Sequence, residues 1–261
     1  MKIAIITGGS SGIGKATASH FSQKGYKVYE FSRKGVSTDT VTHVTCDVSD
    51  EISCKNAIST VIEQEGRIDI VINNAGFGIS GAIEHTDTID AKRLFDVNFF
   101  GMHNVTKNVL SYLKDSKGRL VNVSSVGGRL SLPFQAFYSA SKNAVDAYTL
   151  ALRNEVKNYG VSVCAVLPGD VQTGFTESRQ KSTAGSESYG GRIERSVKGM
   201  EKDETNGYTP EYMAKRIFKI ATKRRVRPLY TLGFKYRVLM CLAKFLPLGL
   251  VNRVIYMLYA K

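Results

Sequence analysis

Short apolar runs alternate with longer segments of helical periodicity along residues 1–170, and this alternation constrains the fold more than any other feature of the chain. The apolar runs, each of strand length, cover residues 2–7, 27–31, 43–48, 69–76, 119–125 and 161–169. The helical segments cover residues 13–24, 51–65, 90–113 and 138–158. Strands that alternate with helices are joined by right-handed crossovers into a parallel sheet with helices on both faces. We therefore predict a doubly wound α/β fold, which binds its ligands at the carboxyl ends of the strands.

The chain changes in character after the last of these strands. Residues 174–207 are polar and rich in Ser and Gly, which is typical of a lid over a ligand site. We expect a helix from Pro210 to about residue 223, because Pro suits the first helical position. Residues 229–261 are apolar with interspersed Lys and Arg. We predict a single Rossmann-type domain at 1–228, with its lid at about 174–207, and a basic, apolar helical extension at 229–261.

The net charge of +13 at pH 7 is carried by one end of the chain. Residues 211–261 hold twelve of the 36 Lys and Arg but only one of the 23 Asp and Glu. The nearly neutral remainder disfavours nucleic acid as a partner. The apolar stretch at this end is divided at Pro247, and neither piece has the ~20 apolar residues that span a bilayer. Two interpretations stay open: residues 223–261 lie on an anionic membrane surface, or they form a subunit interface or a flap over the substrate mouth.

The four cysteines, Cys46, Cys54, Cys164 and Cys241, show neither a C-x-x-C pair nor a nearby His at metal-binding spacing. We therefore expect neither a metal site nor a disulfide framework. The first apolar run is too short for a signal peptide and ends in glycines. These features favour a cytoplasmic protein, whose membrane contact in the first interpretation lies on the cytoplasmic face.

A glycine-rich loop follows the first predicted strand and opens the first predicted helix. Glycines allow a backbone to turn sharply and to approach a pyrophosphate closely, and the helix N-terminus supplies free N–H groups and a positive dipole end. The spacing G-x-x-x-G-x-G differs from the G-x-G-x-x-G of the common dinucleotide fingerprint. The candidate nucleotide-binding residues of this loop are Thr7, Gly8, Ser10, Ser11, Gly12, Ile13 and Gly14.

Tyr138 and Lys142 are four residues apart on a predicted helix, so their side chains share one face. A lysine charge beside a phenol stabilises the phenolate, and we expect Lys142 to lower the pKa of Tyr138 from its ordinary value of ~10. Such a phenol is suited to proton transfer near neutral pH. Ser125 ends the fifth predicted strand, thirteen residues before Tyr138, and Asn98 lies on the preceding helix. Together they form a candidate catalytic set.

The order of these motifs resembles that of the short-chain dehydrogenase/reductase family, including some hydroxysteroid and retinol dehydrogenases. The motifs that carry the resemblance, over about residues 1–175, are the T-G-x-x-x-G-I-G loop, Asn73-Asn74-Ala75-Gly76, and the Ser125–Tyr138–Lys142 set with Asn98 before it. The resemblance implies that Tyr138 is the general acid for ketone reduction and the base for alcohol oxidation, while Ser125 hydrogen-bonds the substrate oxygen. It also implies that Lys142 holds the nicotinamide ribose and that Asn98 anchors a water in a proton relay.

The same resemblance implies contacts with the rest of a nicotinamide dinucleotide. Beyond the glycine loop, Tyr138 and Lys142, these are Asp47 and Val48 at the adenine, Asn74, Ala75 and Gly76 at the ribose, and Pro168, Gly169, Val171 and Thr173 near the nicotinamide. All of them fall at or near the predicted carboxyl ends of strands, where the fold places its ligands.

The end of the second predicted strand bears on the choice between NAD and NADP. NAD-selective proteins of this fold place an acid there to hold the ribose 2′-hydroxyl. In this chain Ser32 stands at that position, and the Arg33 that follows suits a 2′-phosphate by its charge and fork geometry. Glu30, two residues earlier, should point to the same face as Ser32 and is the alternative. We favour NADP(H) over NAD(H) as the cofactor.

We predict an NADP(H)-dependent oxidoreductase that interconverts a ketone or aldehyde and an alcohol, on a lipophilic substrate of steroid, retinoid or other lipid type. Phe134, Phe137 and Phe175 flank the expected pocket mouth, although core packing explains them equally well. A homo-oligomer, dimeric or tetrameric, is expected. The alternative is a non-catalytic dinucleotide-binding regulatory or scaffold protein at a membrane surface, which the intact catalytic set disfavours.

Overall fold

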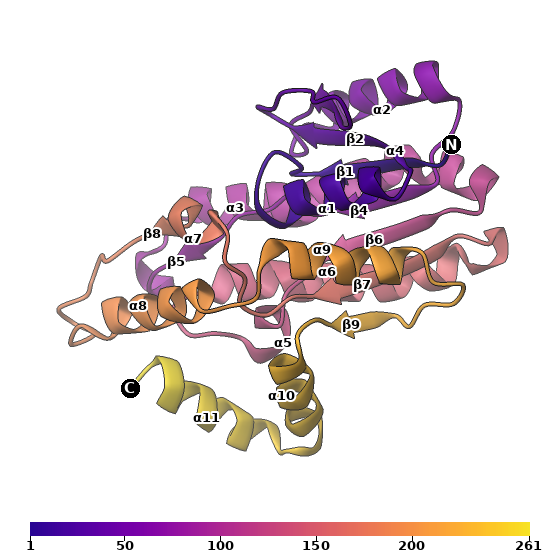
Figure 1. The fold of residues 1–261 in the computed structure, drawn as a ribbon. Helices are drawn as coiled ribbons and strands as arrows, with labels where there is room; N and C mark the ends of the chain where they lie inside the picture. Colours follow the sequence, from indigo (N-terminus) through magenta and orange to yellow (C-terminus); the bar gives the residue numbers. More distant parts are fainter.

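The computed structural model describes residues 1–261 and has a seven-stranded sheet between two layers of helices (Figure 1). The strands are β1 (Ile3–Thr7), β2 (Lys27–Ser32), β3 (Thr42–Thr45), β4 (Ile70–Asn73), β6 (Arg119–Val123), β7 (Ser162–Leu167) and β9 (Leu229–Thr231). Their order is β3-β2-β1-β4-β6-β7-β9, and every neighbouring pair is parallel. The strand order reverses between β1 and β4, where this fold opens a crevice for ligands. The predicted doubly wound α/β fold is confirmed.

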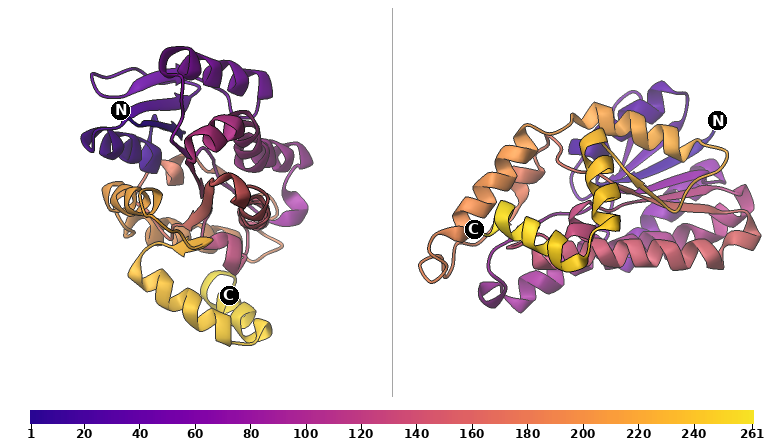
Figure 2. Two further views of the ribbon diagram at one scale, coloured as in Figure 1. Left: turned by 90° about the vertical axis from the view of Figure 1, so that its right-hand side faces the viewer. Right: turned by 90° about the horizontal axis from the view of Figure 1, so that it is seen from below.

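Helices cover both faces of the sheet (Figure 2). One layer consists of α2 (Glu51–Glu65), α4 (Gly101–Ser116) and α6 (Ala136–Glu155), and the other of α1 (Gly12–Gln23) and α9 (Pro210–Ala221). Alternate residues of β1 point to opposite layers, so that Ile3 and Ile5 pack with the first while Ala4 and Ile6 pack with the second. Because both faces are buried, the strands read as continuous apolar runs in the sequence.

Local sequence signals set several helix ends. Asp50 caps α2 by accepting a first-turn N–H, and Gly66 ends this helix in the left-handed conformation, with φ of 66°. Thr209 caps α9 by accepting the Tyr212 N–H at 3.2 Å, and Pro210 occupies the first position. The observed bounds of α2 match the prediction, and α9 ends two residues early at Ala221.

The segment predicted as one helix over residues 90–113 is interrupted. Helix α3 (Thr88–Phe95) passes into a π-helical turn, η2 (Asp96–Phe100), before α4 begins. Such turns are rare and are frequent at functional sites. The buried side chain of Asn98 projects from η2 and hydrogen-bonds both backbone groups of Phe77. These bonds hold the turn in a geometry that helical periodicity alone does not indicate.

The seventh strand lies outside the predicted domain. The sequence assigns residues 229–231 to the C-terminal extension, whereas they form β9 and pair with Ala165–Leu167 of β7. Three residues are too few to show the alternation that marks a strand. The domain therefore extends at least to Thr231, which corrects the predicted boundary at residue 228.

The predicted lid segment, residues 174–207, contains regular structure. It holds α7 (Phe175–Ser178), β8 (Gln180–Lys181), which pairs with β5 (Ile79–Ser80), and α8 (Arg192–Thr205). One face of α8, formed by Ile193, Val197 and Met200, packs in a small apolar cluster with Ala82. The remaining short elements are η1 (Ile83–His85), α5 (Gly127–Leu130) and η3 (Lys157–Tyr159).

The chain ends in two helices beyond the β9 edge of the sheet, α10 (Phe234–Phe245) and α11 (Leu248–Tyr259), which we call the C-terminal hairpin (Figures 1 and 2). Pro247 separates the two helices, as predicted. Helix α11 returns toward the body and contacts α8 and α5. Across the whole structure, no helix is both long enough and apolar enough to cross a bilayer.

Candidate active site

A cavity of about 310 Å³ opens at the carboxyl ends of the central strands. The residues of its wall that the sequence singles out are Gly8, Ser11, Gly12, Ile13, Asn74, Ala75, Gly76, Ser125, Tyr138, Lys142, Pro168, Gly169, Val171, Thr173 and Phe175. They belong to the segments that follow β1, β4, β6 and β7, which are neighbours in the sheet although they are far apart in the chain. The parallel topology thus assembles the separate motifs around one space.

The glycine loop is held against the loop that follows β4. The Thr7 hydroxyl accepts hydrogen bonds from the N–H groups of Asn74 at 2.9 Å and Ala75 at 3.0 Å. Gly8 adopts a positive φ of 65°, and a Cβ on Gly14 would overlap the carbonyl oxygen of Gly8. Both positions therefore require glycine. The bare backbone that results, beside the N-terminus of α1, suits the pyrophosphate of a dinucleotide.

The candidate catalytic side chains lie together at the cavity wall. The Ser125 hydroxyl, just after β6, accepts the Gly127 N–H at 3.0 Å and lies near enough to Tyr138 to lower the pKa of its phenol. Tyr138 and Lys142 are one turn apart on α6, with the Lys142 Nζ 5.9 Å from the centre of the Tyr138 ring. This Nζ donates to the Val123 carbonyl at 3.0 Å. Two hydroxyl groups and one ammonium group are therefore available at the same end of the cavity.

Burial governs the protonation of Tyr138 and Lys142. It raises the pKa of Tyr138 above its ordinary value of 10, and this effect outweighs the Ser125 hydrogen bond and the charge of Arg179, which act in the opposite direction. Burial also lowers the pKa of Lys142 from 10.5 to about 8, partly offset by Asp146. The expectation that Lys142 lowers the pKa of Tyr138 therefore does not hold in this structure, because desolvation of the phenol dominates.

Asn98 joins the loop after β4 to α6. Its Oδ1 accepts the Phe77 N–H at 3.0 Å, and its Nδ2 donates to the Phe77 carbonyl at 2.9 Å and to the Ser141 hydroxyl at 3.2 Å. A Cβ on Gly76 would lie within 3.4 Å of both Asn98 Oδ1 and Lys142 Nζ. The absence of a side chain at Gly76 thus leaves room for a ligand beside these two groups.

The sequence profile of the short chain dehydrogenase family matches residues 2–184. The chain belongs to the short-chain dehydrogenase/reductase family. A 3-ketodihydrosphingosine reductase of Bacteroides thetaiotaomicron is 42% identical over 227 residues, which cover 85% of this chain and 84% of that protein. As a family member, this protein is an oxidoreductase that acts on CH–OH groups with a nicotinamide nucleotide.

Solved structures show the same relationship. A short-chain dehydrogenase from Streptomyces avermitilis superposes with a TM-score of 0.82 at 25% identity, and the match covers 97% of each chain. An alcohol dehydrogenase from Thermococcus sibiricus, complexed with 5-hydroxy-NADP, superposes with a TM-score of 0.71 at 25% identity, covering 89% of this chain and 96% of that chain. The fold of this short-chain dehydrogenase/reductase is therefore shared over nearly its whole length.

In this short-chain dehydrogenase/reductase the side chains at the end of β2, which bear on the choice between NAD and NADP, lie outside the cavity. Ser32 is buried, and its hydroxyl donates to Glu30 Oε1 at 3.2 Å, so both side chains lie on the same face as expected. Glu30 is itself buried beneath Gly9 of the glycine loop, and its carboxylate contacts His43. Arg33 is exposed. At this strand end the carboxylate of Glu30 is therefore enclosed by the protein, while the guanidinium group of Arg33 is exposed to solvent.

Some predicted site residues do not reach the cavity wall: Thr7, Ser10, Gly14, Ser32, Arg33, Asp47, Val48 and Asn98. Thr7, Gly14 and Asn98 support the wall from behind through the contacts given above. Asp47 follows β3, and its carboxylate accepts the Ser49 N–H at 3.0 Å. Val48 is buried against Gly101.

One wall of the cavity was not predicted residue by residue, although four of its members lie in the predicted lid. It is formed by Leu132, Gln135, Ser178, Arg179, Met200, Glu204 and Tyr259. Of the three phenylalanines expected at the mouth, only Phe175 lines the cavity. Phe134 packs on the ring of Tyr189 instead, with their centres 5.7 Å apart.

The C-terminal hairpin is fastened to the rim of the same cavity. The Tyr236 hydroxyl donates to the Asp170 carboxylate, and the Tyr259 hydroxyl donates to Asp203 at 3.2 Å. Gly169 lies directly against the ring of Tyr236, where a Cβ would overlap it. The hairpin therefore forms part of the site rather than a separate appendage.

Proposed function

We propose that this protein reduces the carbonyl group of a lipophilic ketone or aldehyde to an alcohol, with NADPH as the hydride donor. The observation that carries the proposal is the convergence of Ser125, Tyr138 and Lys142 on one cavity, with Asn98 behind them. The bound nucleotide would supply a hydride to the carbonyl carbon. The Tyr138 hydroxyl donates its proton to the carbonyl oxygen, which Ser125 holds by a hydrogen bond.

The protonation of the site supports the reductive direction. With its raised pKa, Tyr138 is a neutral phenol at neutral pH, which is the form that can give a proton. Lys142, whose pKa is about 8, is mostly protonated there and can hold a ribose hydroxyl beside Gly76. Asn98 fixes the Phe77 backbone, and we assign it the anchoring of a water that returns a proton toward Tyr138 through Lys142.

The preference for NADPH rests on the charges at the end of β2. Arg33 and Lys34 are both exposed beside the glycine loop. A 2′-phosphate carries negative charge and several acceptor oxygens, which a guanidinium group binds in a fork. The carboxylate of Glu30, which could hold a 2′-hydroxyl, is buried: its Oε1 is engaged by Ser32 and His43, and its Oε2 is enclosed beneath Gly9 without a partner. This arrangement favours the phosphorylated cofactor.

The lipophilic substrate is supported by the apolar part of the cavity wall, to which Leu132, Phe175, Met200 and Tyr259 contribute. The similar protein from Bacteroides thetaiotaomicron is named for 3-ketodihydrosphingosine. This compound is an amino ketone with a long alkyl chain, which matches a cavity that has both polar and apolar walls. We therefore propose a sphingoid or related lipid ketone as the substrate.

The direct test is to incubate the purified protein with NADPH and 3-ketodihydrosphingosine in detergent micelles. We expect NADPH oxidation that depends on the ketone, with the corresponding alcohol detected by mass spectrometry. Steroid and retinoid carbonyl compounds of similar solubility complete the panel. If none of these carbonyl compounds is reduced, the proposed activity is wrong.

We further propose that the C-terminal hairpin docks on anionic lipid at the cytoplasmic face of a membrane. Its exposed large apolar side chains are Phe234, Val238, Leu239, Leu242, Phe245, Leu246, Leu248, Leu250, Val254, Tyr256, Met257 and Leu258. Its charged side chains, Lys235, Arg237, Lys244 and Arg253, are all basic. An exposed apolar surface of this extent, rimmed only by cations, suits an anionic lipid surface. Since Tyr259 lines the cavity, docking would bring the cavity close to the lipid.

We also propose that the protein forms a homo-oligomer through the layer of α4 and α6. Phe100, next to the start of α4, and Leu150 on α6 are exposed on this layer. Apolar side chains on a rigid helical face suit the self-complementary interface of a symmetric dimer.

A further inference from the structure

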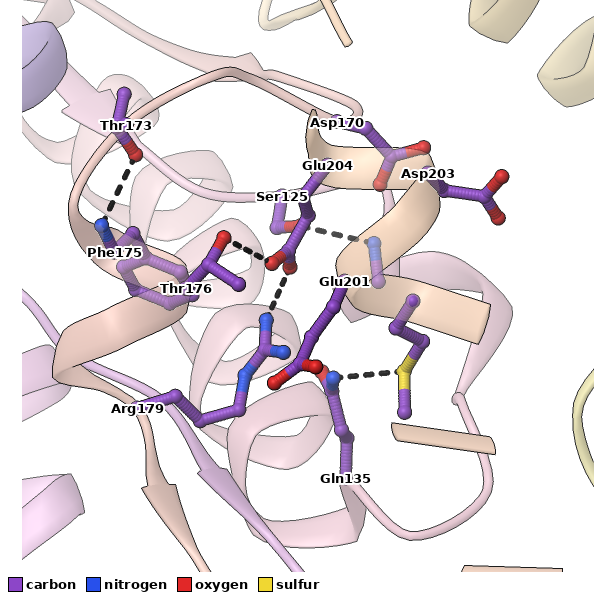
Figure 3. A network of polar contacts seen from close by, with 12 residues as sticks. Ser125, Gln135, Asp170, Thr173, Phe175, Thr176, Arg179, Glu201, Asp203 and Glu204 are labelled. Carbon is purple, nitrogen blue, oxygen red and sulfur yellow. Dashed lines mark hydrogen bonds and ion pairs between the residues drawn. The ribbon is translucent and has the colours of Figure 1, made fainter. Parts of the chain in front are cut away.

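A buried ion pair lies in the wall of the cavity and has no part in the proton transfer described above. Arg179 lies between α7 and β8, and its side chain is only 1% exposed. Its Nη2 donates to Glu204 of α8, and Figure 3 shows the two side chains reaching toward each other from opposite elements. The second oxygen of Glu204 accepts the Thr176 hydroxyl at 2.6 Å. Glu204 is thus fully engaged by the protein.

Arg179 is not fully engaged. Its Nε and Nη1 are buried and have no hydrogen-bond acceptor in the protein. Nε lies on the side of Gly78, where a Cβ would come within 3.4 Å of it. Buried donors in proteins nearly always have an acceptor, since a buried unpaired donor is destabilising. Because Arg179 lines the substrate cavity, the missing acceptor is best supplied by a ligand in that cavity.

The guanidinium group is close to the reacting end of the site. The ring of Phe175 lies 5.7 Å from the ring of Tyr138, measured between centres, and 5.5 Å from the Cζ of Arg179. One aromatic ring therefore separates Arg179 from the proton donor. Together these distances place the Cζ of Arg179 no more than about 11 Å from the centre of the Tyr138 ring, so the polar end of one substrate can reach both side chains.

The surrounding charges indicate what kind of group this is. Glu204 already neutralises Arg179, Glu201 of the same helix pairs with Lys181, and Asp170 and Asp203 lie beyond Glu204 (Figure 3). An acidic substrate group would meet these carboxylates and be repelled. A hydroxyl group accepts from Arg179 without adding negative charge, and an amine beside it would be attracted by the carboxylates.

We propose that the Arg179–Glu204 pair is a binding subsite for a non-acidic, hydroxyl-bearing head group next to the reactive ketone. The hydroxyl oxygen accepts from the free N–H groups of Arg179, while the alkyl part of the substrate runs along the apolar wall at Phe175 and Met200. The subsite rests on the proposed reductase function and specifies which polar group the substrate carries. It selects amphiphilic ketones over purely apolar ketones and over keto acids.

The test compares three ketones of equal chain length with the wild-type protein and Arg179→Met. The first has an amine on the carbon next to the ketone and a hydroxyl one carbon further, the second lacks only the hydroxyl, and the third is a keto acid. We expect the wild type to prefer the first ketone, in kcat/KM, by about tenfold or more over the other two, the scale of one hydrogen bond to a charged group. Arg179→Met should lose that preference, with kcat/KM for the first ketone falling to that for the second.

Two further variants separate recognition from folding. Arg179→Met leaves Glu204 buried without its partner, so the double variant Arg179→Met/Glu204→Gln restores a neutral pair and should show the same loss of preference. Arg195→Met removes an exposed arginine from α8 and should behave as the wild type does. Unchanged NADPH affinity, measured by fluorescence titration, verifies that the nucleotide site is intact in each variant.

The results distinguish the subsite from the activity itself. If the wild type reduces all three ketones equally, or prefers the keto acid, the subsite is wrong although the reductase function stands. If Arg179→Met slows the first two ketones equally, Arg179 has only a structural role. If no ketone is reduced, the proposed function fails. Calorimetric binding of the first two ketones to the NADPH complex of Tyr138→Phe then decides the subsite, with equal affinities contradicting it.

Discussion

Lys142 is a residue at which stability and function make opposite demands. Its side chain is nearly fully buried, with 5% of the residue exposed, and burial lowers its pKa to about 8. Below that pH the folded protein holds a buried charge that the unfolded chain would expose to water, which destabilises the fold. The same charge, beside Gly76 and one helical turn from Tyr138, is what a nucleotide ribose and a proton relay need.

Replacing this lysine should therefore stabilise the protein while it abolishes turnover. The pKa of Lys142 in the folded protein, about 8, lies below its ordinary value of 10.5. The destabilisation by the buried charge is therefore complete below about pH 8 and fades as the pH approaches 10.5. At ~1.4 kcal/mol per pKa unit, the upper limit of this destabilisation is roughly 3.5 kcal/mol. We expect Lys142→Met to have a Tm a few degrees above that of the wild type at neutral pH. Thermal unfolding followed by circular dichroism checks this, and a lower Tm at neutral pH would contradict it.

Arg33 carries the second prediction at this scale. Arg33→Asp removes the exposed cation next to the glycine loop and adds an acid that repels a 2′-phosphate. We expect KM for NADPH to rise at least about tenfold, while KM for NADH is unchanged or falls. Lys24→Asp, which makes the same charge change at the opposite end of α1, should alter neither value. A wild-type KM that is lower for NADH than for NADPH would refute the cofactor assignment.

Among the elements, those with a local signal were predictable and those set by tertiary contacts were not. Buried strands such as β1 and β7, and helices with caps such as α2, follow from apolar runs, Asp50 and Gly66. The turn η2 depends on the hydrogen bonds of Asn98 to a distant loop, and β9 depends on pairing with β7. Helix α8 did carry a signal, because Ile193, Val197 and Met200 recur at helical spacing inside a polar stretch.

The C-terminal hairpin carries the prediction at the scale of elements. We expect the wild type to float with anionic phosphatidylglycerol vesicles at low salt, to release at high salt, and to bind phosphatidylcholine vesicles weakly. Phe245→Glu/Leu248→Glu places two acids at positions that are 80% and 83% exposed, so it should fold normally and remain unbound. Its turnover of a water-soluble ketone should equal that of the wild type. Wild-type protein that stays unbound to anionic vesicles would exclude this docking surface.

At the scale of the whole molecule, the topology explains how much of the site the sequence contains. Parallel strands place Gly8, Asn74, Ser125 and Pro168 at one edge of the sheet, so recognising the strands was enough to bring their motifs together. The opposite wall follows no such rule. Tyr259 reaches the cavity because the C-terminal hairpin folds back over the body, as the flap interpretation of residues 223–261 allowed, but nothing near Tyr259 in the sequence singles out this residue.

The oligomer is the prediction at this scale. If the layer of α4 and α6 is an interface, size-exclusion chromatography with light scattering should give at least twice the chain mass of 28.7 kDa. Leu150→Glu, on the exposed face of α6, should shift the protein toward the monomer without loss of helical signal. A wild-type mass of one chain at every concentration would contradict a homo-oligomer.

The central claim is that Tyr138 donates the proton in carbonyl reduction, and Tyr138→Phe tests it most directly because only the hydroxyl is removed. With NADPH and a lipid ketone that the wild type reduces, we expect turnover to fall at least about a hundredfold. The Kd for NADPH should stay within about twofold of the wild-type value, and Tyr159→Phe, at an exposed position, should change neither quantity. A Tyr138→Phe protein that keeps more than about a tenth of wild-type turnover would contradict the account.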